Sequence, residues 1–215
     1  MSILTLYAFN PKQTGANAGL LTPTQPTAST STTGWTVATA SVNYSRMSYN
    51  LERASNTFNP TQEPSGAPLA QAPDCFRISD ATTGDFSAGT WYSSLSVIAV
   101  TAGTTHDGRA LFRIWRASSS SAVSPTQISS SIMTGTLIAN LTTTVAQSSA
   151  ASIQVGAFSL SNEYLFLQCA WQRTGAGGSS SNDVLLRYGS MGQTNGTGLV
   201  TTDFTVSGGG GGTVP

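Results

Sequence analysis

Residues 90–103, "TWYSSLSVIAVTAG", alternate in character, and this alternation constrains the fold more than any other feature of the chain. Trp91, Ser93, Leu95 and Val97 occupy one set of alternate positions. The other set begins at Tyr92 and carries mostly hydroxyls until its last residues. A period of two residues is typical of a half-buried β-strand, so this segment is predicted to be a strand with one face in the core.

Similar short runs recur along the chain, and many are separated by clusters of Gly, Asn, Asp or Ser. They are "CFRISD", "RALFRIWRA", "TQISSSIMTGTLI", "SIQVGAFSL", "NEYLFLQCAWQR", "DVLLRYGS" and "DFTVSG". The segment "ATTGDFSAG" is turn-rich, and "YSRMSYNLERA" comes nearest to a helical period. The pattern predicts an all-β protein, an antiparallel β-sandwich of jelly-roll type.

Residues 1–73 differ from the rest because they are rich in Pro, Thr, Ser and Gly. Proline removes backbone donors and fixes φ, so these stretches are expected to be extended. We therefore predict an N-terminal arm over 1–73 with one strand or hairpin beginning near Trp35. A β-sandwich domain should follow over 74–206, and a flexible glycine-rich tail over 207–215.

The run "NEYLFLQCAWQR" is the strongest candidate for a core strand. One face would carry Leu165, Leu167, Cys169 and Trp171, and the other would carry Tyr164, Phe166 and Ala170. Both faces are largely apolar, so both should be covered. We expect the opposed sheet to cover one face, and the arm or a neighbouring subunit to cover the other.

Charge is scarce: only 8% of the 215 residues are charged, there is one lysine, and the formal net charge is zero. An average soluble protein has roughly 25% charged residues. Serine and threonine, 31 of each, take their place. The zero net charge argues against a nucleic-acid partner, because proteins that bind nucleic acids usually carry a basic surface patch. A surface with few charges and no net charge favours association, so we expect other protein subunits to cover part of it.

The remaining sequence signals point to no cofactor, metal or membrane. Cys75 and Cys169 match no metal-binding spacing, and whether they form a disulfide stays open. The N-terminus "MSILTLYAFNPKQTG" lacks the basic region and cleavage site of a signal peptide. No apolar run is long enough to span a membrane.

The stretch "TTHDGRALFRIWRA" contains the single histidine of the chain, His106, beside Asp107 and Gly108. Asp-Gly between two apolar runs is a strong hairpin signal, so these residues are predicted to form an exposed turn. A hydrolase would need a nucleophile and an orienting carboxylate near the histidine, and no Gly-x-Ser-x-Gly elbow occurs. We therefore predict no catalytic residues and no enzymatic activity.

The candidate interface or binding residues are Trp35, Trp91, Arg113, Trp115 and Arg116. An arginine near a tryptophan suggests stacking or a carbohydrate platform, with Trp91, Trp115 or Trp171 as its aromatic surface. The alternatives are an ordinary cross-strand neighbour, an ion pair with Glu163 or Asp183, or a subunit interface anchored by Arg113.

Several segments together resemble the virion proteins of tailed bacteriophages, in particular capsid decoration or cement proteins. They are "GTWYSSLSVIAVTAG", "GRALFRIWRASSSS", "SPTQIS" and "NEYLFLQCAWQRTGAGG", set in a Ser/Thr/Gly-rich β background behind a Pro/Thr-rich arm. The resemblance implies a structural subunit of the virion, made in the host cytoplasm. Its partners would be the major capsid protein or other virion subunits, and it would form a homo-oligomer, with a trimer favoured. A tail, collar or fibre component and a carbohydrate-binding β-sandwich module are the alternatives, so a glycan is a further candidate partner.

Overall fold

The protein is built from β-strands. The computed structural model describes residues 2–9, 19–22, 44–47, 75–99, 106–120, 122, 124–129, 133–141, 147–173, 184–187 and 198–206. The strands within these ranges are β1 (Ser2–Phe9), β2 (Gly19–Thr22), β3 (Tyr44–Met47), β4 (Cys75–Ile78), β5 (Thr82–Phe86), β6 (Gly89–Ala99), β7 (His106–Ala117), β8 (Thr126–Gln127), β9 (Met133–Thr134), β10 (Ile138–Leu141), β11 (Gln147–Val155), β12 (Phe158–Arg173), β13 (Val184–Arg187) and β14 (Gly198–Val206). No helix of the described part has the length and apolar character needed to cross a membrane.

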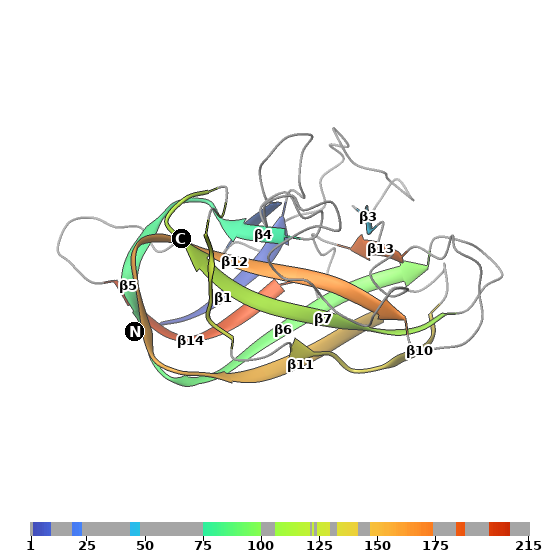
Figure 1. The fold of residues 1–215 in the computed structure, drawn as a ribbon. Coiled ribbons are helices and arrows are strands. Elements are labelled where there is room, and N and C mark those ends of the chain that lie inside the picture. Colours follow the sequence, from blue (N-terminus) through green and yellow to red (C-terminus); the bar gives the residue numbers. More distant parts are fainter. Residues whose placement is uncertain are drawn as a thin grey trace.

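The strands form one sheet that curls into a half-barrel (Figure 1). The main path runs β10-β7-β12-β4-β2-β1-β14-β6-β13-β3, β11 adds to β6, and β5 pairs with both β12 and β14. Every ladder is antiparallel except β2–β4. We refer to β4, β12 and β7 as the β7 wall and to β1, β14, β6 and β11 as the β6 wall. The predicted all-β antiparallel class is confirmed.

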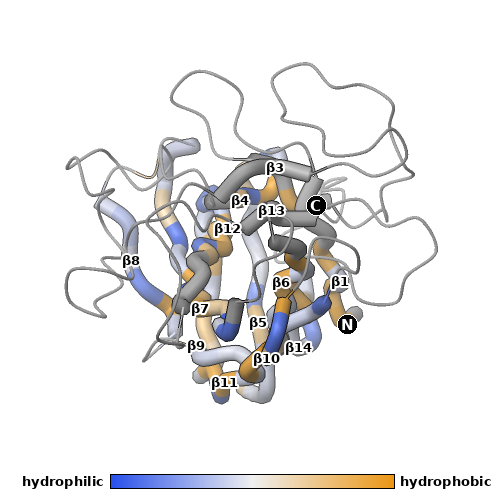
Figure 2. Tube along the Cα trace, turned by 90° about the vertical axis from the view of Figure 1, so that its right-hand side faces the viewer, coloured by the Kyte–Doolittle hydropathy of each residue, from blue (hydrophilic) through white to orange (hydrophobic). Residues whose placement is uncertain are grey.

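The core lies between the two walls, and alternating residues supply it (Figure 2). On β6, Trp91, Leu95 and Val97 are buried while Tyr92 is exposed, as their alternation predicts. On β12, Leu165, Leu167 and Cys169 face the same core.

On the opposite face of β12, Phe166 is also buried, as predicted. Phe166 packs in a second cluster with Trp115, Ala117 and Ala122. β7 and the segment after it supply these apolar partners, and cover of this face by the arm or a neighbouring subunit stays a prediction. The side chains of Ala170 and Trp171 lie outside the described part.

The hydroxyl of Ser149 connects β11, at one side of the curled sheet, with β7, at the other side. The Oγ of Ser149 on β11 accepts a hydrogen bond from the backbone N–H of Ala110 on β7 at 2.9 Å. The same hydroxyl donates to the carbonyl of Thr136 at 2.6 Å. The N–H of Gly135 in turn donates to the carbonyl of Ala110 at 2.8 Å. Backbone groups of Ala110 at the edge of β7 are thus satisfied, as buried polar groups must be.

The predicted hairpin turn at His106–Gly108 is wrong. These residues begin β7, where Gly108 pairs with Ile138 and Arg173. Among the described residues, no ladder joins β6 to β7, because each lies in a different wall and β7 pairs with β12 over ten residues. Asp107 instead accepts a hydrogen bond from the N–H of Asn140 at 2.9 Å, which fixes β10 against β7.

Two other local predictions are corrected. The turn-rich segment "ATTGDFSAG" contains β5, which is held between β12 and β14. Gly84 is required there because a Cβ at this position would overlap the ring of Phe204. The segment closest to a helical period contains β3, which pairs with β13. In both places long-range pairing overrides the local signal.

An N-terminal arm is not shown. Within residues 1–73, the structure describes only β1, β2 and β3, and all of them belong to the sheet. Leu4, Leu6 and Leu21 are part of the core, so β1 and β2 are elements of the β domain. For the rest of residues 1–73, the arm stays a prediction. The Pro/Thr-rich stretches 11–18, 23–33 and 56–73, as well as Trp35 and the tail 207–215, lie outside the described residues.

Candidate functional site

The structure places two of the predicted tryptophans, Trp91 and Trp115, in the interior, where they cannot form a glycan platform. Trp91 is 0% exposed, its ring centroid lies 5.0 Å from that of Phe86, and its Nε1 donates to Thr202 Oγ1 at 3.0 Å. Trp115 is 3% exposed, and its Nε1 donates to Gln168 Oε1 at 3.2 Å. The platform prediction is therefore wrong for both residues. Their strands turn the rings toward apolar neighbours, because burial of such large surfaces is strongly favourable.

The two predicted arginines lie near each other on β7, but they have separate partners. Arg113 donates to Gln127 Oε1 at 3.3 Å, and burial lowers the pKa of its guanidinium below the ordinary value. It stays charged, since arginine keeps its proton in proteins. Arg116 lies 3.4 Å from Glu163 and donates to the carbonyl of Ser159 at 2.6 Å. The ion pair with Glu163, one of the alternatives offered by the sequence, is confirmed for Arg116.

Arg77 on β4 adds a third guanidinium to this wall. It stands 5.1 Å from the centroid of the Tyr164 ring and donates to the carbonyls of Ile78 and Ser79 at 2.8 and 2.6 Å. These contacts orient the side chain along its own strand. Arg77, Arg113 and Arg116 therefore have local structural roles, and these contacts go to separate partners.

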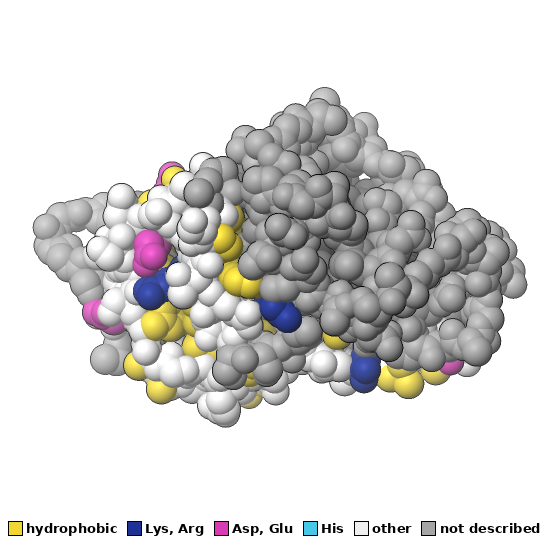
Figure 3. Space-filling model, in the orientation of Figure 1, with side chains coloured by type: hydrophobic (Ala, Val, Ile, Leu, Met, Phe, Trp, Pro, Cys, Tyr) yellow, Lys and Arg dark blue, Asp and Glu magenta, His cyan; other side chains and the backbone are white. Residues whose placement is uncertain are grey.

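The surface of the described part carries very little charge. Among the side chains that the structure describes, Asp80 and Asp85 are the only charged ones that are exposed, and others such as Arg116 and Glu163 are half-buried. Most other exposed positions are hydroxyl-bearing or small residues, and the face in Figure 3 shows mainly uncharged atoms outside the grey regions. No group of three His, Cys, Asp or Glu side chains comes together as a metal site in the described ranges. We name this exposed, charge-poor surface the hydroxyl coat.

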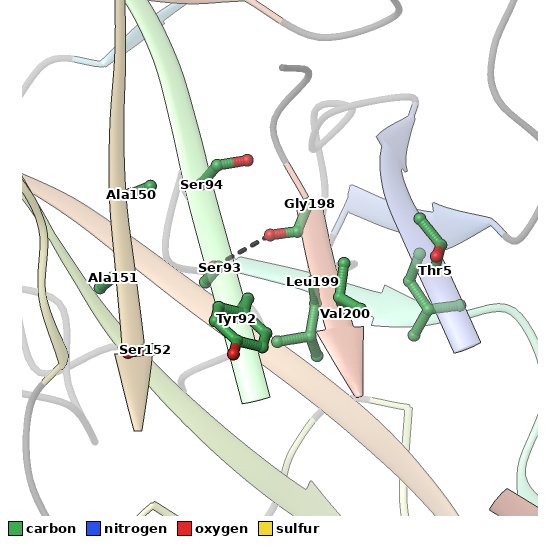
Figure 4. A pocket seen from close by; sticks show the side chains of 11 residues that line it. Thr5, Tyr92, Ser93, Ser94, Ala150, Ala151, Ser152, Gly198, Leu199 and Val200 are labelled. Carbon is green, nitrogen blue, oxygen red and sulfur yellow. Dashed lines mark hydrogen bonds between the residues drawn. The ribbon is translucent and has the colours of Figure 1, made fainter. Parts of the chain in front are cut away.

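One hollow interrupts the outer face of the β6 wall (Figure 4). It has a volume of about 360 Å³. Its lining residues come from all four strands: Thr5, Leu6, Tyr92, Ser93, Ser94, Ala150, Ala151, Ser152, Gly198, Leu199 and Val200. Sequence reasoning did not single out this place. The one available signal was Tyr92, an aromatic residue on the hydroxyl face of an alternating strand.

Comparison with known proteins shows a fold likeness and no family. No known protein family matches the chain, and no curated protein matches it. It is similar in structure to part of an aminopeptidase from the marine sediment archaeon Thaumarchaeota archaeon, with a TM-score of 0.52 and 12% sequence identity. The aligned region covers 93% of this chain and 36% of that chain.

A CocE/NonD family hydrolase from Staphylococcus aureus gives a TM-score of 0.50 at 8% identity, with 94% of this chain and 36% of the hydrolase covered. The chain thus spans about a third of the length of each of these proteins. At such identities the likeness extends to the fold alone, because one fold hosts many functions.

Proposed function

We propose that the chain is a structural subunit of a virion, a capsid decoration or cement protein with a β-sandwich of jelly-roll type. The hydroxyl coat is the observation that carries this proposal. A protein surface with almost no exposed charge has weak colloidal repulsion, so it favours association with other protein surfaces. In a particle, neighbouring subunits would cover such a surface and remove the tendency to associate without order.

The partners in this proposal are the major capsid protein or other virion subunits, and the chain itself forms a homo-oligomer, most simply a trimer matching the local symmetry of a capsid. The protein would act in the virion and catalyse no reaction of its own. A tail, collar or fibre component has the same surface requirement. Identification of the bound partner distinguishes it from a head protein.

The test is co-sedimentation of the purified full-length chain with capsids that lack it, together with its mass in solution by light scattering. We expect an oligomer that binds the particle and resists moderate salt, since few charges contribute to the contact. Deleting residues 1–33, an obvious arm truncation, is unsuitable because it would remove core residues Leu4, Leu6 and Leu21.

Charge-introducing variants locate the contact without disturbing the core. Thr126→Lys and Thr134→Lys add a cation beside β7, and Ser152→Lys adds one on the β6 wall; all three positions are exposed. We expect at least one of them to weaken particle binding while the circular dichroism spectrum is unchanged. A monomer that binds neither capsids nor tails would refute the proposal.

A further inference from the structure

The hollow on the β6 wall has a flat floor made by adjacent strands in register. Thr5 pairs with Val200, Val200 with Tyr92, and Tyr92 with Ser152, so these four form one outward row. The next row runs through Gly198, Ser94 and Ala150, and Tyr7 of β1 pairs with Gly198 at its end. Successive outward rows on a sheet lie two residues apart, so the two rows are immediate neighbours on the same face.

The members of the second row on β14, β6 and β11 are all small, and they leave a hollow beside Tyr92. Gly198 has no side chain, and those of Ser94 and Ala150 are short, so Tyr92 borders a depression. Tyr92 is 54% exposed, although an aromatic side chain ordinarily buries most of its surface. Below the floor, Ser93 is buried and its Oγ donates to the carbonyl of Gly198 at 2.9 Å, which ties β6 to β14 at this point (Figure 4).

The lining is chemically two-sided. Tyr92, Val200 and Ala150 offer apolar surface, while Thr5, Ser94 and Ser152 offer hydroxyls that both donate and accept hydrogen bonds. Among the residues that the structure describes, no charged side chain lines the hollow. A charged ligand would lose its hydration there without gaining a counter-charge, so the lining favours a neutral one.

A saccharide ring has the same two-sided character, with C–H groups on its faces and hydroxyls around its edge. Small-molecule sites measure about 300–1,000 Å³, so the hollow is at the small end of this range. We propose that it binds a neutral mono- or disaccharide unit, with one ring face on Tyr92 and the ring hydroxyls directed to Thr5, Ser94 and Ser152. This binding site is additional to the structural role proposed above and does not depend on it.

The full-length protein, labelled with ¹⁵N, is titrated with four neutral disaccharides: maltose, cellobiose, lactose and N,N′-diacetylchitobiose. We expect at least one of them to shift the backbone amides of Tyr92, Ser94 and Ser152, with a dissociation constant on the order of 1 mM, as suits a shallow site. Tyr92→Ala should weaken this binding by about tenfold or more, and Tyr92→Phe by less than about threefold, because the ring is retained. Ala150→Leu should also weaken it by filling the hollow.

Leu137→Ala is the matched control, since Leu137 is 60% exposed and does not line the hollow; it should leave binding unchanged. The proposal is overturned if none of the four sugars shifts these amides, or if Tyr92→Ala binds as well as the unaltered chain. Binding of the anionic sugar 6′-sialyllactose alone would contradict a neutral ligand. Loss of the oligomer in Tyr92→Ala would also overturn it, because a second copy would then occupy the hollow.

Discussion

Removal of the Ser149 hydroxyl should weaken the contact between β11 and β7 and lower the free energy of unfolding. Ser149 is 0% exposed, and its Oγ bonds both the N–H of Ala110 and the carbonyl of Thr136. Ser149→Ala deletes both bonds and leaves the buried Ala110 N–H without an acceptor. An unsatisfied buried donor costs about 1–3 kcal/mol. Thr136 is exposed, so water can replace the lost partner of its carbonyl at small cost.

Together these terms predict a loss of about 1.5–3 kcal/mol in the free energy of unfolding. For a chain of this size such a loss lowers Tm by roughly 3–12 °C. Thermal and urea unfolding followed by tryptophan fluorescence measure it, because Trp91 and Trp115 are buried. Hydrogen exchange adds a local readout: the Ala110 amide should exchange faster in Ser149→Ala, whereas amides within the β7–β12 ladder should change only with global stability.

Ser152→Ala is the matched control, because Ser152 lies on the same strand and is exposed. Surface substitutions of this kind usually stay within about 0.5 kcal/mol. The reasoning is refuted if Ser149→Ala lowers the free energy of unfolding no more than Ser152→Ala and the Ala110 amide keeps its protection. The hydroxyl would then not hold β11 against β7.

Two further pairs of variants test the core and the strand that sequence reasoning missed. Leu167→Ala should cost about 2–5 kcal/mol because Leu167 is fully buried, whereas Leu137→Ala should cost within about 0.5 kcal/mol; equal effects in urea unfolding would contradict the assigned facing. Gly84→Ala should destabilise by about 1–3 kcal/mol because its Cβ would overlap a core ring. Gly156→Ala, with open space around the position, should be neutral or slightly stabilising, and a Gly84→Ala protein as stable as Gly156→Ala would show that β5 is not held against β14.

The candidate site was only partly accessible from the sequence. An ion pair with Glu163 or Asp183 was one of the alternatives, and Arg116 makes the pair with Glu163, because an arginine in a charge-poor chain has few acids to choose from. The platform alternative was wrong for Trp91 and Trp115, since a strand sequence does not reveal which wall will cover which face. The hollow at Tyr92 depends on the small residues Gly198 and Ala150, which two other strands, β14 and β11, place beside it, and no local pattern contains that information.

The sequence by itself determined the strand class, the facing of β6 and β12, and the scarcity of surface charge. Alternation is a local property, and it fixes which side chains share a face once a strand forms. The tertiary structure decided which strands pair with one another. It paired β7 with β12 instead of β6, made a strand of the turn-rich segment at β5, and took β1 and β2 into the sheet. These choices depend on the summed burial of residues far apart in the chain, and such non-local contacts leave no periodic signal in any one segment.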